Sequence, residues 1–213
     1  MKKLITSGNT FLLIGLAAVF AISACSSTGM QRSEDVQSSM ETVDNNIKEI
    51  VVQLDAINSS LDELTKPGQA DRKKAFDLYS DEASKIKKME QGFARHADQM
   101  EASGKAYFEE WDKNGNQYDN PEIQARSEER RAELGNTYDK IAQRNVGVKE
   151  AFKTYVSDVN EIEEFLSNDL TSDGIDSITP IADNVVNNGS QLKRELQNLQ
   201  SAIEDARREM RRD

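Results

Sequence analysis

Residues 33–66 read SEDVQSSMETVDNNIKEIVVQLDAINSSLDELTK. Their apolar residues recur at steps that alternate between four and three: Val36, Met40, Val43, Ile47, Ile50, Leu54, Ile57, Leu61 and Leu64. A repeat of about 3.5 residues keeps all of these side chains on one stripe of an α-helix and is typical of a coiled coil. The other positions are mostly polar or charged. The stretch therefore predicts a long helix that begins at Ser33 as its N-cap and buries its stripe against other helices.

Three later segments repeat this pattern and predict three more helices. One runs from about Asp71 to Lys113, one follows the N-cap Asn120, and one begins at Ser172, with Pro180 marking a second start or a kink. Their stripes are Phe76, Tyr79, Ala83, Ile86, Glu90, Phe93, Ala97, Met100, Gly104, Tyr107 and Trp111; then Ile123, Leu134, Tyr138, Ile141, Asn145, Val148, Phe152, Tyr155, Val159, Ile162 and Leu166; then Ile178, Ala182, Val185, Gly189, Leu192, Leu196, Leu199, Ile203, Ala206 and Met210.

The breaks between these segments are short, so neighbouring helices should pack antiparallel. We expect an all-α protein over residues 33–213, an elongated antiparallel helical bundle or coiled coil of about four long helices. Small residues in the second stripe, such as Ala97 and Gly104, would let a neighbouring helix approach closely. The stripes could be buried within one chain or between the chains of a homo-oligomer.

The N-terminal residues predict export and attachment to a membrane. A basic start at Lys2 and Lys3 precedes an apolar run over residues 11–22, which is shorter than the roughly 20 apolar residues of a spanning helix. The run ends in Ile22-Ser23-Ala24-Cys25, which resembles the bacterial lipobox. That resemblance implies a signal peptide over residues 1–24, covalent diacylglycerol and an N-acyl chain on Cys25, and a tether over residues 25–32. Several acyl chains on one residue suffice for stable attachment.

The residue after the cysteine indicates which membrane holds the protein, and the net charge indicates which binding partners are disfavoured. Ser26 stands where Asp would signal retention, so in a bacterium with two membranes we expect the outer membrane, facing the periplasm. The net charge of −11 becomes two units more negative when Lys2 and Lys3 are removed. Such a charge disfavours nucleic acid and anionic lipid surfaces as partners. The membrane, through the lipid, is the predicted partner.

Residue types that carry chemistry are sparse or poorly placed. The only histidine is His96, in the middle of a predicted helix, and acylation of Cys25 leaves no thiol. Two aspartate-rich breaks, residues 112–123 and 169–180, resemble calcium loops, but Ile123 and Pro180 occupy the twelfth position that requires a bidentate Glu. We read these breaks as turns, and we expect no catalytic residues, no metal and no cofactor besides the lipid.

The densest group of large side chains is Tyr107, Phe108, Trp111 and Tyr118. Its first interpretation is packing at one end of the bundle. Because Trp and Tyr are favoured anchors of protein interfaces, the group is also a candidate site for an envelope protein partner.

Several short motifs resemble a bacterial family. They are Phe108-Glu109-Glu110-Trp111, then Tyr118, Asn120 and Ser127, and the run Thr137-Tyr138-Asp139-Lys140-Ile141. Together they resemble the family catalogued as domain of unknown function 2959, whose members are small, acidic, helical and often lipoproteins. The turn residues 114–116 and a longer stretch between Phe152 and Asn168 depart from the family pattern. The resemblance implies an architecture and no activity.

Two functions follow as hypotheses. The first is a non-catalytic, lipid-anchored envelope protein that acts as a periplasmic spacer, scaffold or sensor. The second is a helical binding module, a chaperone or an adaptor, that contacts an envelope protein through the Trp111 end.

Overall fold

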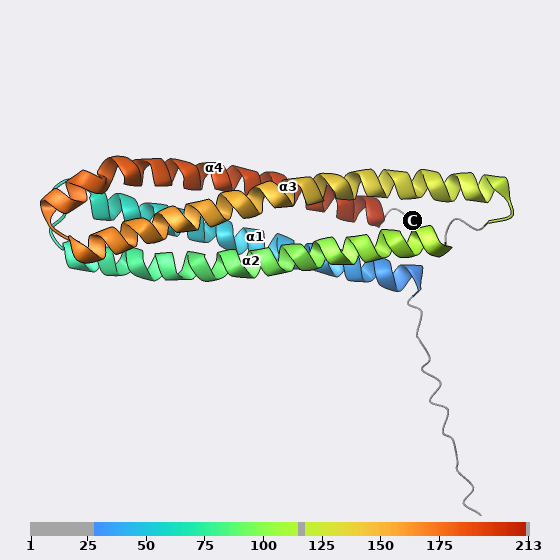
Figure 1. Cartoon of the computed structure of the whole chain (residues 1–213), viewed down its shortest axis with the longest axis horizontal. Coiled ribbons are helices and arrows are strands. Elements are labelled where there is room, and N and C mark those ends of the chain that lie inside the picture. The colour runs from blue at the N-terminus through green and yellow to red at the C-terminus, as the bar shows by residue number, and fades with distance from the viewer. Residues whose placement is uncertain (1–27, 115–117, 212–213) are drawn as a thin grey trace, which may run out of the picture.

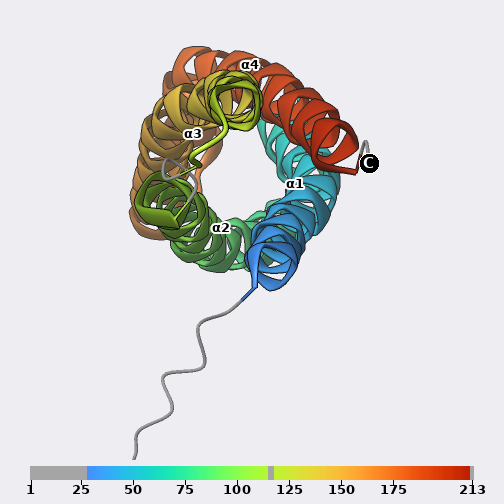
Figure 2. The ribbon, with the colours of Figure 1, turned by 90° about the vertical axis from the view of Figure 1, so that its right-hand side faces the viewer.

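The computed structural model describes residues 28–114 and 118–211, which form four α-helices and no strands. They are α1 (Gly29–Thr65), α2 (Arg72–Asn114), α3 (Pro121–Asn168) and α4 (Ser172–Met210). Each helix packs against two others, in the ring order α1, α2, α3, α4 and back to α1, as the view along the bundle shows (Figure 2). The predicted all-α, elongated four-helix bundle is confirmed (Figure 1).

The predicted stripes form the core. All nine stripe residues of α1 are at most 1% exposed, and Tyr79, Phe93, Phe152 and Tyr155 are among the largest fully buried side chains. The clearest exception is Ile123, which is 50% exposed. It lies in the first turn of α3, where this helix runs past the ends of the other three (Figure 1). A periodic pattern assigns a face to a residue, but it does not ensure that another helix reaches that face.

Two seam glycines permit close contact between helices, as the sequence predicted. A Cβ atom at Gly104 would overlap the ring of Tyr138, whose hydroxyl donates to the carbonyl of Met100. A Cβ atom at Gly189 would lie 2.7 Å from Asn58 Oδ1 and 2.9 Å from Tyr155 Cε2. The Tyr155 hydroxyl donates to Asn58 Oδ1 over 2.8 Å. Small residues therefore make room for large aromatic rings rather than for a ligand.

The start of α1 differs from the prediction. Thr28 is the N-cap, and its Oγ1 accepts from the N–H of Gln31 at 3.2 Å. Ser33 lies inside the helix, where its hydroxyl accepts from the side chain of Gln37. The predicted tether over residues 25–32 is therefore too long, because α1 begins at Gly29. Two hydroxyl residues could cap this helix, and the earlier one does so.

The prolines at the other breaks act in different ways. Asn120 caps α3 ahead of Pro121, as predicted, and its Oδ1 accepts from Glu122 N at 2.9 Å. A second helix start at Pro180 is wrong, because α4 runs through this residue from its N-cap Thr171. Ile175 and Ile178, which both precede Pro180, are buried in the core. Tertiary packing therefore stabilises the first turns of α4.

The two ends of the bundle are built differently. At the closed end, residues 66–71 join α1 to α2 and residues 169–171 join α3 to α4. Gly68 has φ 75° in the first link, and Arg72 donates to Ser172 Oγ at 2.7 Å, which connects the starts of α2 and α4. At the open end, α1 and α3 begin and α2 and α4 finish (Figure 1). The predicted aromatic group lies at the open end.

Candidate functional site at the open end

The aromatic cluster of the open end comprises Tyr107, Phe108, Trp111 and Tyr138. The Tyr107 ring meets Phe108 edge-on with centroids 5.2 Å apart and Trp111 with centroids 5.6 Å apart. Phe108 in turn meets Tyr138 of α3 at 5.7 Å. These distances and tilted orientations are those of favourable aromatic pairs. Tyr107, its neighbour Phe108 and Trp111 one turn further along α2 thus form one cluster that continues onto α3.

Three of the four predicted partner-binding residues come together, and Tyr118 does not join them. Tyr118 lies between α2 and α3, is 46% exposed, and forms no ring contact among the described residues. Its backbone N–H donates to Gln124 Oε1 at 3.4 Å. Sequence proximity to Trp111 therefore did not predict a shared site.

Trp111 is held from α3. Its indole Nε1 donates to Ser127 Oγ at 3.0 Å, which leaves the ring partly exposed with its polar atom satisfied. Burial raises the pKa of Tyr107, and the positive charges of Arg130 and Arg32 oppose that rise. Both phenol and indole groups are therefore neutral and available for apolar contact at physiological pH.

Two neighbouring arginines of α3 connect it to the ends of its neighbours. Arg130 Nη2 donates to the backbone carbonyl of Glu209 at 2.6 Å, and Nη1 lies 2.5 Å from the Glu209 carboxylate and 3.0 Å from that of Glu133. This carbonyl lies in the last turn of α4, where backbone carbonyls can accept hydrogen bonds from side chains of a neighbouring helix. Hydrogen bonding to Glu209 raises the pKa of Arg130. Arg131 forms an ion pair with Asp112 of α2 at 2.7 Å.

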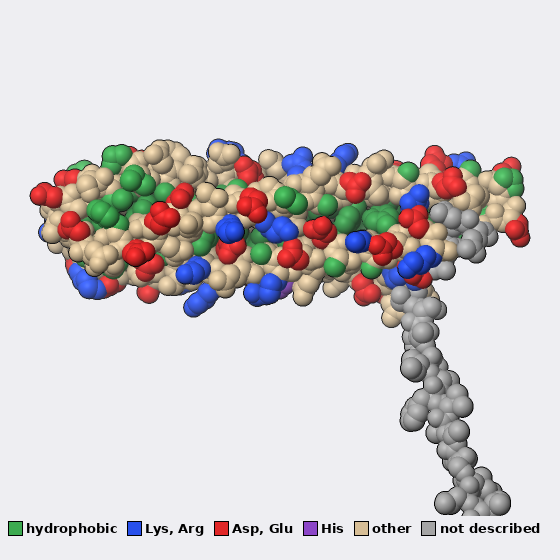
Figure 3. Space-filling model, in the orientation of Figure 1, with side chains coloured by type: hydrophobic (Ala, Val, Ile, Leu, Met, Phe, Trp, Pro, Cys, Tyr) green, Lys and Arg blue, Asp and Glu red, His purple; other side chains and the backbone are tan. Residues whose placement is uncertain are grey.

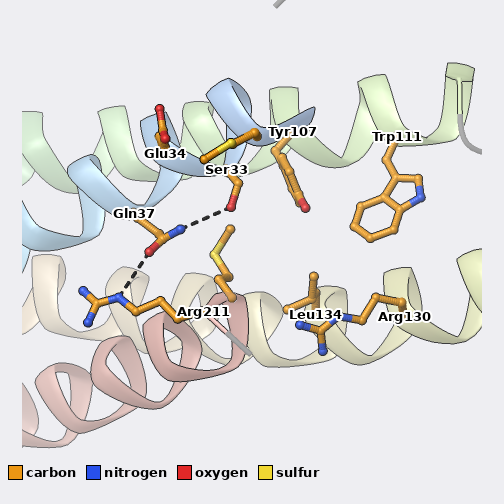
Figure 4. Close-up of a pocket in the computed structure, with 10 residues that line it drawn as sticks. Ser33, Glu34, Gln37, Tyr107, Trp111, Arg130, Leu134 and Arg211 are labelled. Carbon is orange, nitrogen blue, oxygen red and sulfur yellow. Dashed lines mark hydrogen bonds between the residues drawn. The ribbon is translucent and has the colours of Figure 1, made fainter. Parts of the chain in front are cut away.

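The four helix ends enclose a hollow of about 610 Å³ (Figure 4). Figure 4 shows Tyr107 and Trp111 on one side of it, Leu134 and Arg130 on another, and a chain of hydrogen bonds from Arg211 to Gln37 and on to Ser33. Its complete lining is Met30, Ser33, Glu34, Gln37, Tyr107, Trp111, Arg130, Leu134, Met210 and Arg211. Apolar walls with a few amide, carboxylate and guanidinium groups suit a side chain or short segment of another protein.

Phe108 and Tyr138 face a second groove, of about 470 Å³, between α2 and α3. Lys105, Glu109, Asp112 and Arg131 supply charged groups along it. The aromatic cluster therefore borders two hollows, one on each side.

The sequence missed the hollow and the role of Arg130. The stripe residues Tyr107 and Leu134 were identified, but the heptad pattern carries no signal that four helix ends leave space between them. The run of charged residues around Arg126 and Arg131 was visible as a thinly apolar region. Which of its arginines would meet α4 depends on how far α3 extends.

The other residues considered in the sequence analysis are Cys25, the two aspartate-rich breaks and His96. Cys25, with the predicted signal peptide over residues 1–24, lies outside the described residues. Over residues 28–114 and 118–211, no group of three His, Cys, Asp or Glu side chains could hold a metal ion. His96 Nδ1 contacts Asn46 Oδ1 of α1, and Asp169 caps the turn before α4 by accepting from Thr171. Within the same residues, no helix combines the length and apolar character needed to cross a bilayer.

A comparison with known protein families finds a match over most of the chain. The family described as "Protein of unknown function (DUF2959)" matches residues 22–212. The chain belongs to this family. The resemblance inferred from the aromatic motifs is thereby confirmed, and the match extends over all four helices. Neither the curated proteins nor the solved structures contain a significant match.

Proposed function

We propose that the protein is a non-catalytic, lipid-anchored component of the bacterial cell envelope that acts as a spacer, scaffold or sensor. The observation that carries this proposal is the sequence Ile22-Ser23-Ala24-Cys25 at the end of an apolar run, directly before the helical bundle. The bundle supports a spacing role, since α2 alone has 43 residues and is about 65 Å long at 1.5 Å per residue.

A non-catalytic role is supported by where the polar side chains lie. Acidic and basic side chains are interspersed along the bundle (Figure 3). Five ion pairs among the described residues join two exposed side chains, and in each of them the partners are three or four residues apart on one helix. Such pairs face solvent and stabilise helices only modestly. They lack the enclosed surroundings that shift the pKa of a catalytic acid or base.

The anchoring is tested by processing and fractionation. Globomycin should leave the unprocessed precursor, and Cys25→Ala should release the chain from washed membranes, while the control Ser27→Ala stays bound. A membrane fraction unchanged by both treatments would refute the anchor. Changing Ser26 to Asp should move the protein from the outer to the inner membrane of a two-membrane host, which tests the proposed location.

The second candidate function is a helical binding module for an envelope protein. The observation that favours it is the hollow of about 610 Å³, because its walls present Trp111, Tyr107 and Arg130, the residue types that dominate interface energies. A photoreactive residue in place of Phe108, which packs on Tyr107 and lines the neighbouring groove of the same end, should capture a partner in cells. The matched control replaces Leu78, which is on the same helix in the closed half. Equal adducts from both positions would contradict a site at the open end.

A further inference from the structure

The first turns of α3 project beyond the rest of the bundle. The hydrogen bond from Trp111 to Ser127 places Ser127 level with the last turns of α2. From Ser127 back to Pro121 α3 continues for six residues, about 9 Å, whereas α2 continues for only three residues beyond Trp111, about 4.5 Å. We call residues 118–123, with the exposed side chains of Tyr118 and Ile123, the α3 tip. Figure 1 shows this overhang.

The start of α1 lies at the level from which the α3 tip projects. Met30 and Trp111 line the same hollow, so the first turn of α1 is level with the last turns of α2. Two residues lie between Cys25 and Thr28, so three Cα-to-Cα steps of extended chain span at most about 10 Å. The predicted anchor is therefore long enough to reach the level of the α3 tip. An acylated Cys25 and the tip can meet one plane.

The α3 tip carries the side chains that a bilayer interface accepts. Ile123 is 50% exposed and Tyr118 is 46% exposed, and Met30, beside the anchor, is 74% exposed. Tyrosine is enriched at the level of lipid headgroups, where its ring is buried and its hydroxyl stays wet. Figure 3 shows hydrophobic side chains at this end of α3. Among the described residues Tyr118 makes no ring contact, and its 46% exposure shows that it is not a core residue.

The charges at the tip restrict the kind of lipid. Asp119 and Glu122 are acidic, and the nearest arginine of α3, Arg126, is already paired with Glu129 at 3.0 Å. An anionic surface would repel this end, whereas a zwitterionic surface would not. The headgroup chemistry that fits is phosphatidylethanolamine or phosphatidylcholine.

We propose that the α3 tip is a second membrane contact, in which Tyr118 and Ile123 enter the zwitterionic headgroup layer beside the lipid on Cys25. This inference rests on the proposed lipid anchor. One attachment point lets a rod pivot, and two contacts on one end hold it upright. The closed end is then presented about 65 Å from the bilayer, and the hollow faces the membrane surface.

Site-directed fluorescence on the full-length, acylated protein in phosphatidylethanolamine–phosphatidylcholine vesicles tests the proposal. Acylated Cys25 has no free thiol, so Ile123→Cys and the control Ile181→Cys can each be labelled with one bimane group. Ile181 is 52% exposed and lies on α4 near the closed end, which matches Ile123 in residue type and exposure. Both positions face solvent, so neither change should disturb the fold, which far-UV circular dichroism verifies.

The expected result is a blue-shifted emission at position 123 that brominated lipid quenches, and neither effect at position 181. Equal emission and equal quenching at both positions would overturn the proposal. A blue shift at 123 without quenching would indicate burial against another copy of the chain and would also overturn it. Flotation of the same vesicles separates the two hypotheses. Protein that floats through Cys25 but shows no quenching at 123 would leave the anchor intact and refute the tip.

Discussion

The closed half of the bundle and the open end are held together by different forces. In the closed half, stripe residues such as Leu61 and Leu64 are at most 1% exposed, and aromatic rings such as Tyr79 fill the space between the helices. At the open end, the stripe residue Leu134 borders a hollow, and Arg130 connects α3 to the last turn of α4. Apolar residues such as Val36 are still buried at this end, but charged hydrogen bonds there supplement the packing.

This difference predicts that the free energy of local opening falls along the bundle from the closed half to the open end. A buried leucine contributes through many close contacts, whereas partly exposed ion pairs are screened by water and salt. Regions with few buried contacts open locally at low free energy, and binding surfaces are drawn from such regions. The open end therefore combines the lowest expected stability with the candidate site. Four predictions test this contrast, in order of decreasing effect.

The largest effect should come from a matched pair of leucine truncations. Leu61→Ala in the closed half should lower the free energy of unfolding by about 2–5 kcal/mol, because it leaves a cavity in a filled core. Leu134→Ala should cost less than about 2 kcal/mol, because the side chain already borders open space. Urea unfolding of the fragment from Ser26 onward measures both. Equal losses would remove the contrast between the two regions.

The second prediction concerns the place where close packing ends. Gly104→Ala should cost about 1–3 kcal/mol, because the added methyl group must displace the Tyr138 ring, which a hydrogen bond to Met100 holds. Gly135→Ala is the control, since a Cβ atom there meets nothing within 4 Å. It should be neutral or stabilise α3 by up to about 1 kcal/mol. Thermal unfolding measures the stability of both variants. A Gly104→Ala variant as stable as the native chain would show that this contact is loose.

The third prediction weakens the open end alone. Arg130→Met keeps an unbranched apolar stem but removes the guanidinium group and its hydrogen bonds to Glu209, and should cost about 1 kcal/mol. Hydrogen exchange should quicken in the last turn of α4 and stay unchanged at Leu61. Arg126→Met, which removes only an exposed pair with Glu129, is the control. Uniformly faster exchange along α4 would mean that the open end does not unfold locally.

The smallest effect concerns a buried carboxylate on α1. Burial by itself would raise the pKa of Asp44, but hydrogen bonds from Lys48 and Gln200 and the charge of Arg207 lower it overall. Because the pKa of Asp44 is lower in the folded state, its carboxylate stabilises the fold fully at pH values above its ordinary pKa of 3.8. This stabilisation is lost as the pH falls through the folded-state pKa. The stability difference between the native chain and Asp44→Asn should shrink below about pH 4. A difference that is constant with pH would contradict the pairing.

The heptad pattern predicted the core residues closely, and it failed where the bundle ends. Leu61, Phe93 and Leu196 are buried as their spacing requires, because a helix with an apolar stripe must cover it. Ile123 fits the same pattern but is exposed, since no neighbouring helix extends that far. Asn145 keeps its place in the stripe and is buried, although neither of its side-chain polar atoms has a partner among the described residues. Periodicity thus reports the face of a residue and not its surroundings.

By itself, the sequence determined the all-helical architecture, the faces that form the core, the family, and the lipobox-like motif on which the proposed anchor rests. These depend on local spacing and on short motifs, which need no knowledge of distant contacts. Only the tertiary structure decided the hollow beside Trp111, the hydrogen bonds from Arg130 to α4, and the overhang of α3. These depend on the relative lengths and offsets of four helices. That register is set by the packing of side chains far apart in the chain, such as Tyr138 against Gly104.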